Sequence, residues 1–211
     1  VPQVDEAWLG AFAKGLHDLA ELYQCPLVGG DTVGSHQGVF ISVTALGSLP
    51  AGATGLLRSK AVVGDDIWVS GYLGAADVAL RMLQSTVPDD HAQLPSIRGA
   101  LEWPQPRVAL GQRLLGIAHA AIDISDGLTQ DLSHVLEASG VGAVIETARL
   151  PVDPRLAGLD ASICEQAVLH GGDVYELCFT APRQASQAVE QIGSELGLPL
   201  TRIGVIRQAP G

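Results

Sequence analysis

The stretch that most constrains this chain is Ile122–Leu128, where an apolar strand pattern turns directly into a helical one. The run Ala120–Ile122 has the character of a buried strand, and residues 128–138 carry apolar side chains at helical spacing. Between these two segments lie two carboxylates, a hydroxyl and a glycine that lets the backbone turn: Asp123, Asp126, Ser125 and Gly127. The pattern predicts a strand–turn–helix unit whose turn carries the polar groups.

The two carboxylates of this turn suggest a cation site. Asp123 and Asp126 are three residues apart at the mouth of a helix, so we expect them to share a face and hold one hard cation. Ser125 and the free N–H groups of the helix are then expected to meet an anion. A magnesium ion bound together with a phosphate would use both the two carboxylates and the anion-binding groups. Taken alone, such a motif is more often only a helix N-cap with a solvated neighbour, so the rest of the chain has to decide.

Charge and cysteine content exclude several classes of partner. The 211 residues include 12 Lys and Arg against 23 Asp and Glu, a net charge of −11, which argues against nucleic acid or an anionic membrane surface. With so few basic residues, a nucleotide-sized anion would need metal ions held by carboxylates. Three distant cysteines without Cys-x-x-Cys spacing predict a reducing, cytoplasmic setting, with neither disulfides nor zinc: Cys25, Cys164 and Cys178. No run approaches transmembrane length.

The order of the expected elements predicts an α/β fold, more closely an α+β layered one. Helices are predicted over residues 5–23, 75–83, 106–118, 128–138, 163–169 and 183–196, and a polar loop over 88–93. Strands are predicted over residues 27–28, 39–46, 66–70, 120–122, 143–147, 174–180 and 201–206. The flexible stretch Pro50–Gly55 predicts a boundary between a first domain, 1–55, and a second, 56–211.

Three further motifs carry polar chemistry, each with a simpler structural explanation. Gly29–Thr32 allows close approach of a nucleotide with Asp31 as a magnesium ligand, or is only a tight Gly-Gly-Asp turn. Arg58 is placed to clamp a phosphate, or is a solvated surface charge. In His170–Glu176, strand alternation predicts that Asp173 and Glu176 face opposite ways and need not act on one ligand. A polar entry into a strand explains the last motif equally well.

The motifs occur in a specific order along nearly the whole chain, from about Val4 to about Ile206. They are Gly-Gly-Asp-Thr, Arg-Ser before a Gly-Asp turn, Ser-Gly-x-Leu-Gly, Pro-x-Pro-Arg, Ile-Asp-x-Ser-Asp-Gly-Leu and Leu-x-Gly-Gly-x-x-Tyr-Glu-Leu-x-Phe-Thr. This series resembles the thiamine-monophosphate kinase family of the aminoimidazole-ribonucleotide-synthetase-like superfamily. The resemblance implies the end of a half-barrel type N-terminal domain, which binds ATP and Mg²⁺ and dimerises, followed by a mixed α/β C-terminal domain.

The resemblance also implies an activity and a set of site residues. Members of the family transfer the γ-phosphoryl group of ATP to thiamine monophosphate, giving thiamine diphosphate for thiamine biosynthesis, with no side chain acting as nucleophile or base. The resemblance assigns Mg²⁺ binding to Asp31, Asp123 and Asp126. It assigns ATP binding to Gly30, Asp31, Arg58 and Ser125. It assigns substrate contact to Asp173, where the family usually carries glutamate, and Val174 stands where the family has aspartate. The implied partners are ATP, thiamine monophosphate and a second copy of the chain, with neither nucleic acid nor membrane.

Two departures keep other interpretations open. The family's upstream Gly-Asp-Asp region and a C-terminal aromatic are missing from this sequence, so we expect the chain to be a part of the enzyme that is incomplete at both ends. The alternatives are a sister ATP-dependent synthetase or maturation enzyme of the same superfamily, and a non-catalytic module that binds magnesium and nucleotide.

Overall fold

The structure is a computed structural model that describes residues 1–87 and 93–209. The predicted loop 88–93 lies outside the described residues except for Gln93. Contacts between Cα atoms divide the chain into two units, residues 1–48 and 49–211.

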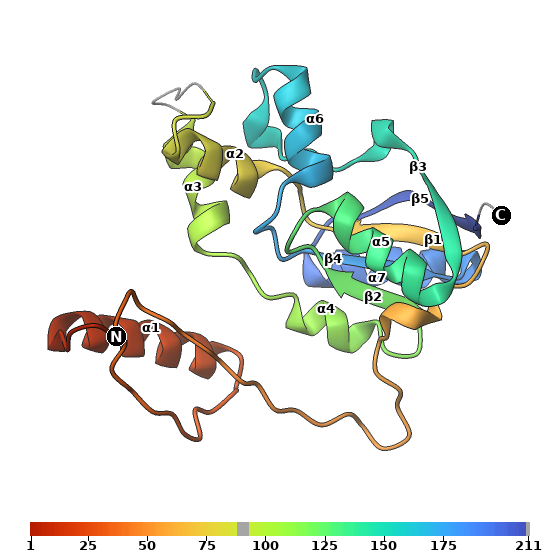
Figure 1. Cartoon of the computed structure of the whole chain (residues 1–211). Coiled ribbons are helices and arrows are strands. Elements are labelled where there is room, and N and C mark those ends of the chain that lie inside the picture. The colour runs from red at the N-terminus through yellow and green to blue at the C-terminus, as the bar shows by residue number, and fades with distance from the viewer. Residues whose placement is uncertain (88–92, 210–211) are drawn as a thin grey trace. The chain divides into compact units, whose positions relative to one another are not determined.

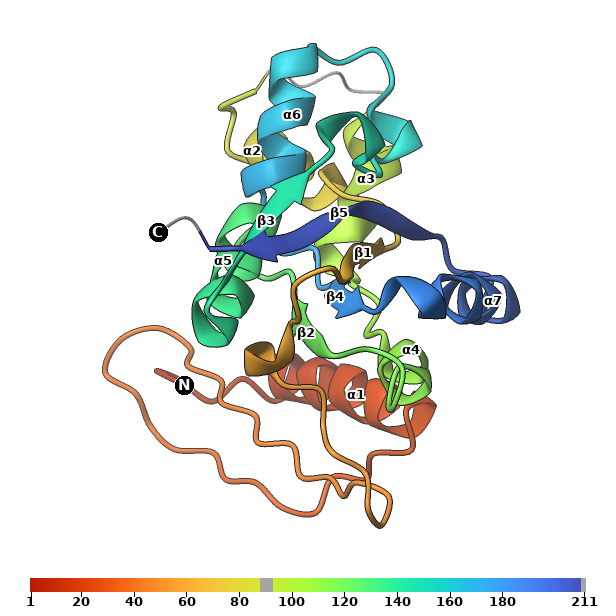
Figure 2. The same cartoon turned by 90° about the vertical axis from the view of Figure 1, so that its right-hand side faces the viewer.

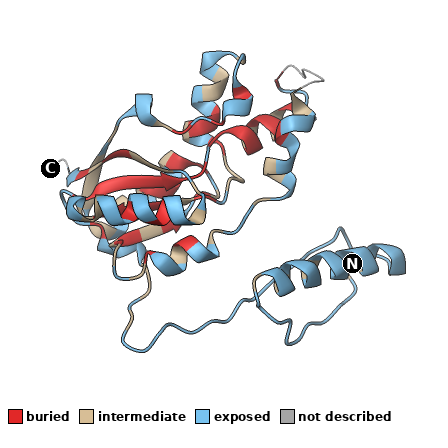
Figure 3. Cartoon of the chain, turned by 180° about the vertical axis from the view of Figure 1, so that it is seen from behind, coloured by how far each residue is buried: buried red, intermediate tan, exposed pale blue. Residues whose placement is uncertain are grey.

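The first unit contains one long helix. Helix α1 (Glu6–Leu22) is capped at its start by Asp5, whose carboxylate accepts hydrogen bonds from the backbone N–H groups of Ala7 and Trp8, both at 3.0 Å. The indole ring of Trp8 stacks on the ring of Phe12 one turn later. No residue of this unit is buried, and Figure 3 accordingly colours it almost entirely as exposed.

The strands predicted over residues 27–28 and 39–46 are wrong for this structure. Both segments lack strand assignment, and no described segment pairs with them. The alternation of apolar residues is present, but a strand needs a neighbour to take up its N–H and C=O groups. Several large apolar side chains of the second segment are therefore exposed: Val39, Phe40, Ile41, Val43 and Leu46.

The second unit is built on a five-stranded antiparallel sheet. The strand order is β2-β4-β1-β5-β3, and every neighbouring pair is antiparallel. The strands are β1 (Asp66–Ser70), β2 (Ala120–Asp123), β3 (Val141–Ile145), β4 (Leu177–Ala181) and β5 (Leu200–Gln208). Figures 1 and 2 show the twisted sheet with helices on both of its faces.

Helices pack on the two faces through two separate apolar clusters. Helix α5 (Leu128–Ser139) packs on one face, where Leu132 and Val135 meet Ile67 and Val69 of β1. Helices α4 (Val108–Arg113) and α7 (Ser186–Leu196) pack on the other face, around Trp68 of β1. Because β1 contributes side chains to both clusters, all five of its residues are buried. The sheet thus forms the middle layer of an α+β fold, as the sequence predicted.

A third apolar cluster joins three helices beyond the end of the sheet. Helices α2 (Ala75–Leu83), α3 (Leu94–Glu102) and α6 (Ala161–His170) pack together through residues such as Val78, Ile97 and Ala167, all with exposed fractions of 0%. Single turns of 3₁₀ helix occur at Arg58–Lys60 (η1), Thr147–Arg149 (η2), Pro154–Leu156 (η3) and Arg183–Ala185 (η4). None of the described helices is long and apolar enough to cross a membrane.

The sequence placed β1 and α2 at their observed bounds and missed details elsewhere. Helix α3 was not predicted, since its Gly and polar residues blur the apolar stripe. The helix predicted over 106–118 is shorter, because α4 begins only after Pro106 and ends before Gly116, whose φ is +77°. The strand predicted over 174–180 starts later, at Leu177, because Asp173 and Tyr175 have positive φ angles.

Candidate cation-binding site

The loop between β2 and α5 is held from inside by a carboxylate. Oδ2 of Asp131, a residue of the first turn of α5, accepts hydrogen bonds from three successive backbone N–H groups, at 3.0, 3.0 and 3.1 Å. These donors belong to Ser125, Asp126 and Gly127. Asp131 itself is only 3% exposed, whereas Asp123 and Asp126 are exposed. The loop thus buries one carboxylate and presents two.

A second loop, between α6 and β4, is fastened to the first by backbone hydrogen bonds. The N–H of Asp173 donates to the carbonyl oxygen of Ser125 at 2.9 Å, and the N–H of Tyr175 donates to that of Ile124 at 2.8 Å. The N–H of Ile124 donates back to the carbonyl oxygen of Glu176 at 2.8 Å. The two motifs that the sequence singled out separately, 122–128 and 170–176, therefore form one continuous surface.

Two glycines make this close approach possible. A Cβ atom on Gly172 would lie 2.5 Å from the carbonyl oxygen of Ser125, and a Cβ on Gly127 would lie 2.7 Å from that of His170. Both neighbours are backbone atoms, which cannot swing away as a side chain can. Gly127 also has a φ of +119°, a conformation that other residues rarely adopt. The sequence attributed these glycines to turns, and the structure adds the docking of the two loops.

The joined loops gather acidic groups around one phenol. The hydroxyl of Tyr175 donates to Oδ1 of Asp173 at 3.3 Å. Burial raises the pKa of this phenol, and the negative charges of Asp173, Asp123 and Asp126 raise it further. Three carboxylates therefore lie near enough to the same ring to act on its charge. Asp173 and Tyr175 have φ angles of +58° and +54°, an unusual backbone that often marks functional loops.

The donor set suits magnesium. Carboxylate and hydroxyl oxygens are hard ligands, and Mg²⁺ typically takes one or two protein carboxylates and completes its shell with water and substrate phosphates. Among residues 1–87 and 93–209, no three His, Cys, Asp or Glu side chains converge closely enough to hold a metal by themselves. The arrangement fits an ion that is bound together with a phosphate ligand better than one held in an all-protein cage.

The structure narrows one expectation about the loop. The sequence suggested that Ser125 and the free N–H groups at the start of α5 would meet an anion. The N–H groups just before the helix, those of Ser125, Asp126 and Gly127, are all taken by Asp131. Ser125 therefore has its hydroxyl, and not its N–H, to offer a ligand. The signal for this was in the sequence, as an acidic residue four positions after Gly127, inside the first helical turn. Anion binding by the first N–H groups of α5 itself, at residues 128–130, stays a prediction.

The remaining predicted residues belong to other parts of the chain. Gly30 and Asp31 belong to the first unit, where the carboxylate of Asp31 accepts a hydrogen bond from the N–H of Thr32 at 2.8 Å. Arg58 lies at the far end of α5, since its carbonyl oxygen accepts a 2.8 Å hydrogen bond from the hydroxyl of Ser139. At about 1.5 Å per residue, the twelve residues of α5 place that end roughly 18 Å from the loop.

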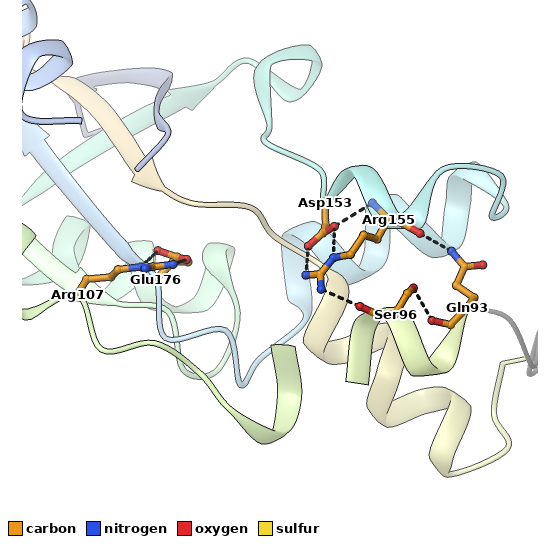
Figure 4. Close-up of polar contacts among 6 residues, drawn as sticks. All are labelled: Gln93, Ser96, Arg107, Asp153, Arg155 and Glu176. Atoms are coloured by element: carbon orange, nitrogen blue, oxygen red, sulfur yellow. Dashed lines mark hydrogen bonds and ion pairs between the residues drawn. The ribbon is translucent and has the colours of Figure 1, made fainter. Parts of the chain in front are cut away.

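Glu176 is a structural partner that the sequence did not identify. Its carboxylate is 6% exposed, and it binds the hydroxyl of Ser70 and, through two hydrogen bonds, the guanidinium of Arg107. Figure 4 shows Arg107 and Glu176 facing each other. A Cβ on Gly71 would overlap the same carboxylate. This pair ties the Pro-x-Pro-Arg motif to the second loop, and it borders a cavity of about 440 Å³ that Trp103 and Val174 also line.

Comparison with known families identifies the family to which this fold belongs. Residues 1–49 match the family described as AIR synthase related protein, N-terminal domain, and residues 62–211 match the corresponding C-terminal domain. The chain belongs to the AIR synthase related family.

Within that family, the relatives point to one group. The chain is 38% identical to the thiamine-monophosphate kinases of Haemophilus influenzae and Escherichia coli K12, over 100% and 97% of its own length. It spans 64% and 62% of the length of these two proteins.

A crystal structure of the thiamine-monophosphate kinase from Stenotrophomonas maltophilia aligns with a TM-score of 0.87 at 39% identity, over 100% of this chain and 68% of that one. A structure described as AaThiL complexed with AMPPCP and TMP shares the fold at 24% identity, with a TM-score of 0.76 over 99% of this chain and 65% of that one.

Proposed function

We propose that this chain forms part of a kinase that transfers the γ-phosphoryl group of ATP to thiamine monophosphate, giving thiamine diphosphate. The observation that carries the proposal is the joining of the two loops, which brings Asp123, Ser125, Asp126 and Asp173 onto one surface. Relatives named thiamine-monophosphate kinase that align with nearly the whole chain support the choice of substrate.

The chemistry needs positioning and charge compensation more than it needs a reactive side chain. An oxygen of the acceptor's phosphate attacks the γ-phosphorus, a P–O bond forms, and the bond to the β-phosphate oxygen breaks as ADP leaves. The acceptor phosphate is already ionised near neutral pH, so no general base is required. Bound Mg²⁺ would neutralise the charge of the transferring group.

We assign roles to the residues that the sequence singled out. Asp123 and Asp126 would hold Mg²⁺ at the loop, and Asp31 would do so from the first unit. Ser125 would offer its hydroxyl to ATP, together with Gly30, Asp31 and Arg58. Asp173, beside the same carboxylates, would contact the thiamine phosphate. We further propose that the protein works in the cytoplasm as a homodimer, and that the two domains are 1–55 and 56–211.

The test is a substrate panel with the full-length product of the gene that encodes this chain. We expect Mg²⁺-dependent formation of ADP and thiamine diphosphate from ATP and thiamine monophosphate, and at least a hundredfold loss of kcat in Asp126→Asn. Asp160→Asn, an exposed helix cap elsewhere in the second unit, serves as the control and should keep full activity.

Two other results would replace the proposal. ADP release with an amide-bearing ribonucleotide, but none with thiamine monophosphate, would indicate a sister synthetase. Mg²⁺-dependent ATP binding without turnover of any acceptor would indicate a binding module.

A further inference from the structure

The inward side of the β2–α5 loop has the geometry of an anion-binding site. Three successive N–H groups, those of Ser125, Asp126 and Gly127, converge on one point. Protein loops commonly bind phosphate with such a set of N–H groups ahead of a helix. Here the point is occupied by Oδ2 of Asp131, a carboxylate of the same chain that is 3% exposed.

We call the three converging N–H groups of residues 125–127 the anion cradle. We propose that Asp131 is a positioning residue that fills this anion cradle itself, so that the loop binds phosphate only through a divalent cation held by Asp123 and Asp126. The identity of the phosphate ligand rests on the function proposed above, whereas the claim about the cradle does not.

The charges around the loop favour phosphate binding through a cation over direct binding to the loop. The negative charges of Asp173, Asp123 and Asp126 all act on the phenol of Tyr175, and the buried carboxylate of Asp131 adds a fourth charge, bound to the backbone of the same loop. A bare phosphate approaching these carboxylates would be repelled by their like charge, and the N–H groups of residues 125–127 would already be taken by Asp131. A divalent cation reverses the sign of the local field and makes the same loop attractive to phosphate.

The same hydrogen bonds also fix the backbone that carries Asp126. Because the N–H groups of residues 125–127 point inward to Asp131, the side chain of Asp126 is left exposed on the turn that follows Asp123, the last residue of β2. Hydrogen bonds to an ionised acceptor are stronger than those to a neutral one. Removing the carboxylate would release three N–H groups and loosen the turn that holds the pair.

The first test measures the cradle directly, by hydrogen exchange of backbone amides in NMR spectra of the chain. The amides of residues 125–127 should be protected in the parent and should exchange at least a hundredfold faster in Asp131→Ala. Asp131→Asn retains an acceptor oxygen and should lie between the two. Rapid exchange of the three amides in the parent would overturn the proposal, whatever the enzyme's activity.

The second test separates the cation from the anion by titration with MgCl₂ and, separately, with metal-free inorganic phosphate. In the parent, Mg²⁺ should shift the resonances of residues 123–126, and phosphate should leave the amides of 125–127 unmoved. In Asp131→Ala the Kd for Mg²⁺ should rise about tenfold, and phosphate should now shift those amides. Asp131→Asn should recover part of the Mg²⁺ affinity, which a role confined to stability would not predict.

Asp153→Asn is the matched control for a buried carboxylate. Asp153 is 4% exposed and accepts a backbone hydrogen bond from the N–H of Arg155 at 2.9 Å, and Figure 4 shows it paired with the Arg155 side chain. This variant should lower the Tm without changing the Mg²⁺ affinity of the loop.

The outcomes distinguish this proposal from the function on which it rests. If the loop of the parent does not respond to Mg²⁺, the proposed function loses its metal site and this proposal fails with it. If the loop responds to both Mg²⁺ and metal-free phosphate, or if Asp131→Ala binds Mg²⁺ as tightly as the parent, this proposal alone is overturned.

Discussion

The backbone N–H of Asp173 lies 2.9 Å from the carbonyl oxygen of Ser125, and this hydrogen bond joins two loops that are almost fifty residues apart in sequence. The contact is made by main-chain atoms and does not depend on the chemistry of the two side chains. It leaves the Ser125 hydroxyl and the Asp173 carboxylate available to a ligand. Backbone hydrogen bonds therefore hold the candidate site together, and its side chains are left to bind a ligand.

Replacing Gly172 with alanine should separate the loops. The new Cβ would lie 2.5 Å from the carbonyl oxygen of Ser125, so we expect a loss of about 1–3 kcal/mol in the free energy of unfolding, as for overpacked sites generally. Gly111→Ala is the control, because nothing lies within 4 Å of a Cβ at that helical position. Urea denaturation should show a neutral or slightly stabilising effect for the control. Equal effects for both variants would contradict the close packing of the loops.

Removing Arg107 should destabilise the second unit. In Arg107→Met, the carboxylate of Glu176 stays buried and loses its ion pair, which typically costs about 3–5 kcal/mol when both partners are inaccessible. Because the Arg107 side chain is 25% exposed, we expect the lower end of that range. In Arg113→Met, the lost pair with Glu195 is exposed and should cost about 0–1 kcal/mol. A similar loss of unfolding free energy in the two variants would show that the Arg107–Glu176 pair stabilises the protein no more than an exposed ion pair does.

The thiol of Cys178 should be unreactive in the folded protein. Burial, and secondly the charge of Asp131, raise its pKa from 9.0 to about 12. At pH 8 the exposed thiol of Cys25 should therefore react readily with a disulfide reagent, and Cys178 only after unfolding. Since the folded pKa is raised, the corresponding stability is present below pH 9 and is lost as the pH rises towards 12. Mass spectrometry that finds rapid modification of Cys178 in the folded protein would refute this.

Asp173 should tolerate asparagine better than glutamate. Its φ of +58° lies in the left-handed region, which asparagine and aspartate adopt more readily than other side chains. Asp173→Asn should keep the Tm and weaken Mg²⁺ binding, because it removes one of the clustered charges. Asp173→Glu keeps the charge and should lower the Tm by a few degrees. Calorimetry tests both, and an unchanged Tm in the glutamate variant would speak against backbone strain at this position.

Much of the fold could be predicted because local pattern and tertiary burial agree. The apolar positions of α5 and the uninterrupted buried run of β1 are decided by the face that each buries. The prediction failed where structure depends on distant partners. The alternation of residues 39–46 is that of a strand, but no described segment pairs with it. Strand β4 starts late because two residues with positive φ precede it, which side-chain alternation cannot reveal.

The site shows the same division between what is local and what is not. The carboxylates of Asp123, Asp126 and Asp173 could be named from their motifs, because glycine-rich turns with acidic residues are local signals. For Asp131 the sequence signals only an acidic residue in the first helical turn, because its three donors are identified once the helix has folded over the loop. The partners of Glu176 could not be identified either, because Ser70 and Arg107 are 106 and 69 residues away from it in the sequence.

We propose that the two joined loops form one face for a divalent cation. The most direct measurement is paramagnetic broadening of backbone amide resonances on addition of Mn²⁺, a substitute for Mg²⁺. We predict that residues 123–126 and 173–175 broaden together at the same Mn²⁺ concentration, and that Asp126→Asn weakens both effects equally. Broadening of one loop without the other, or first at an unrelated acidic surface, would contradict the claim.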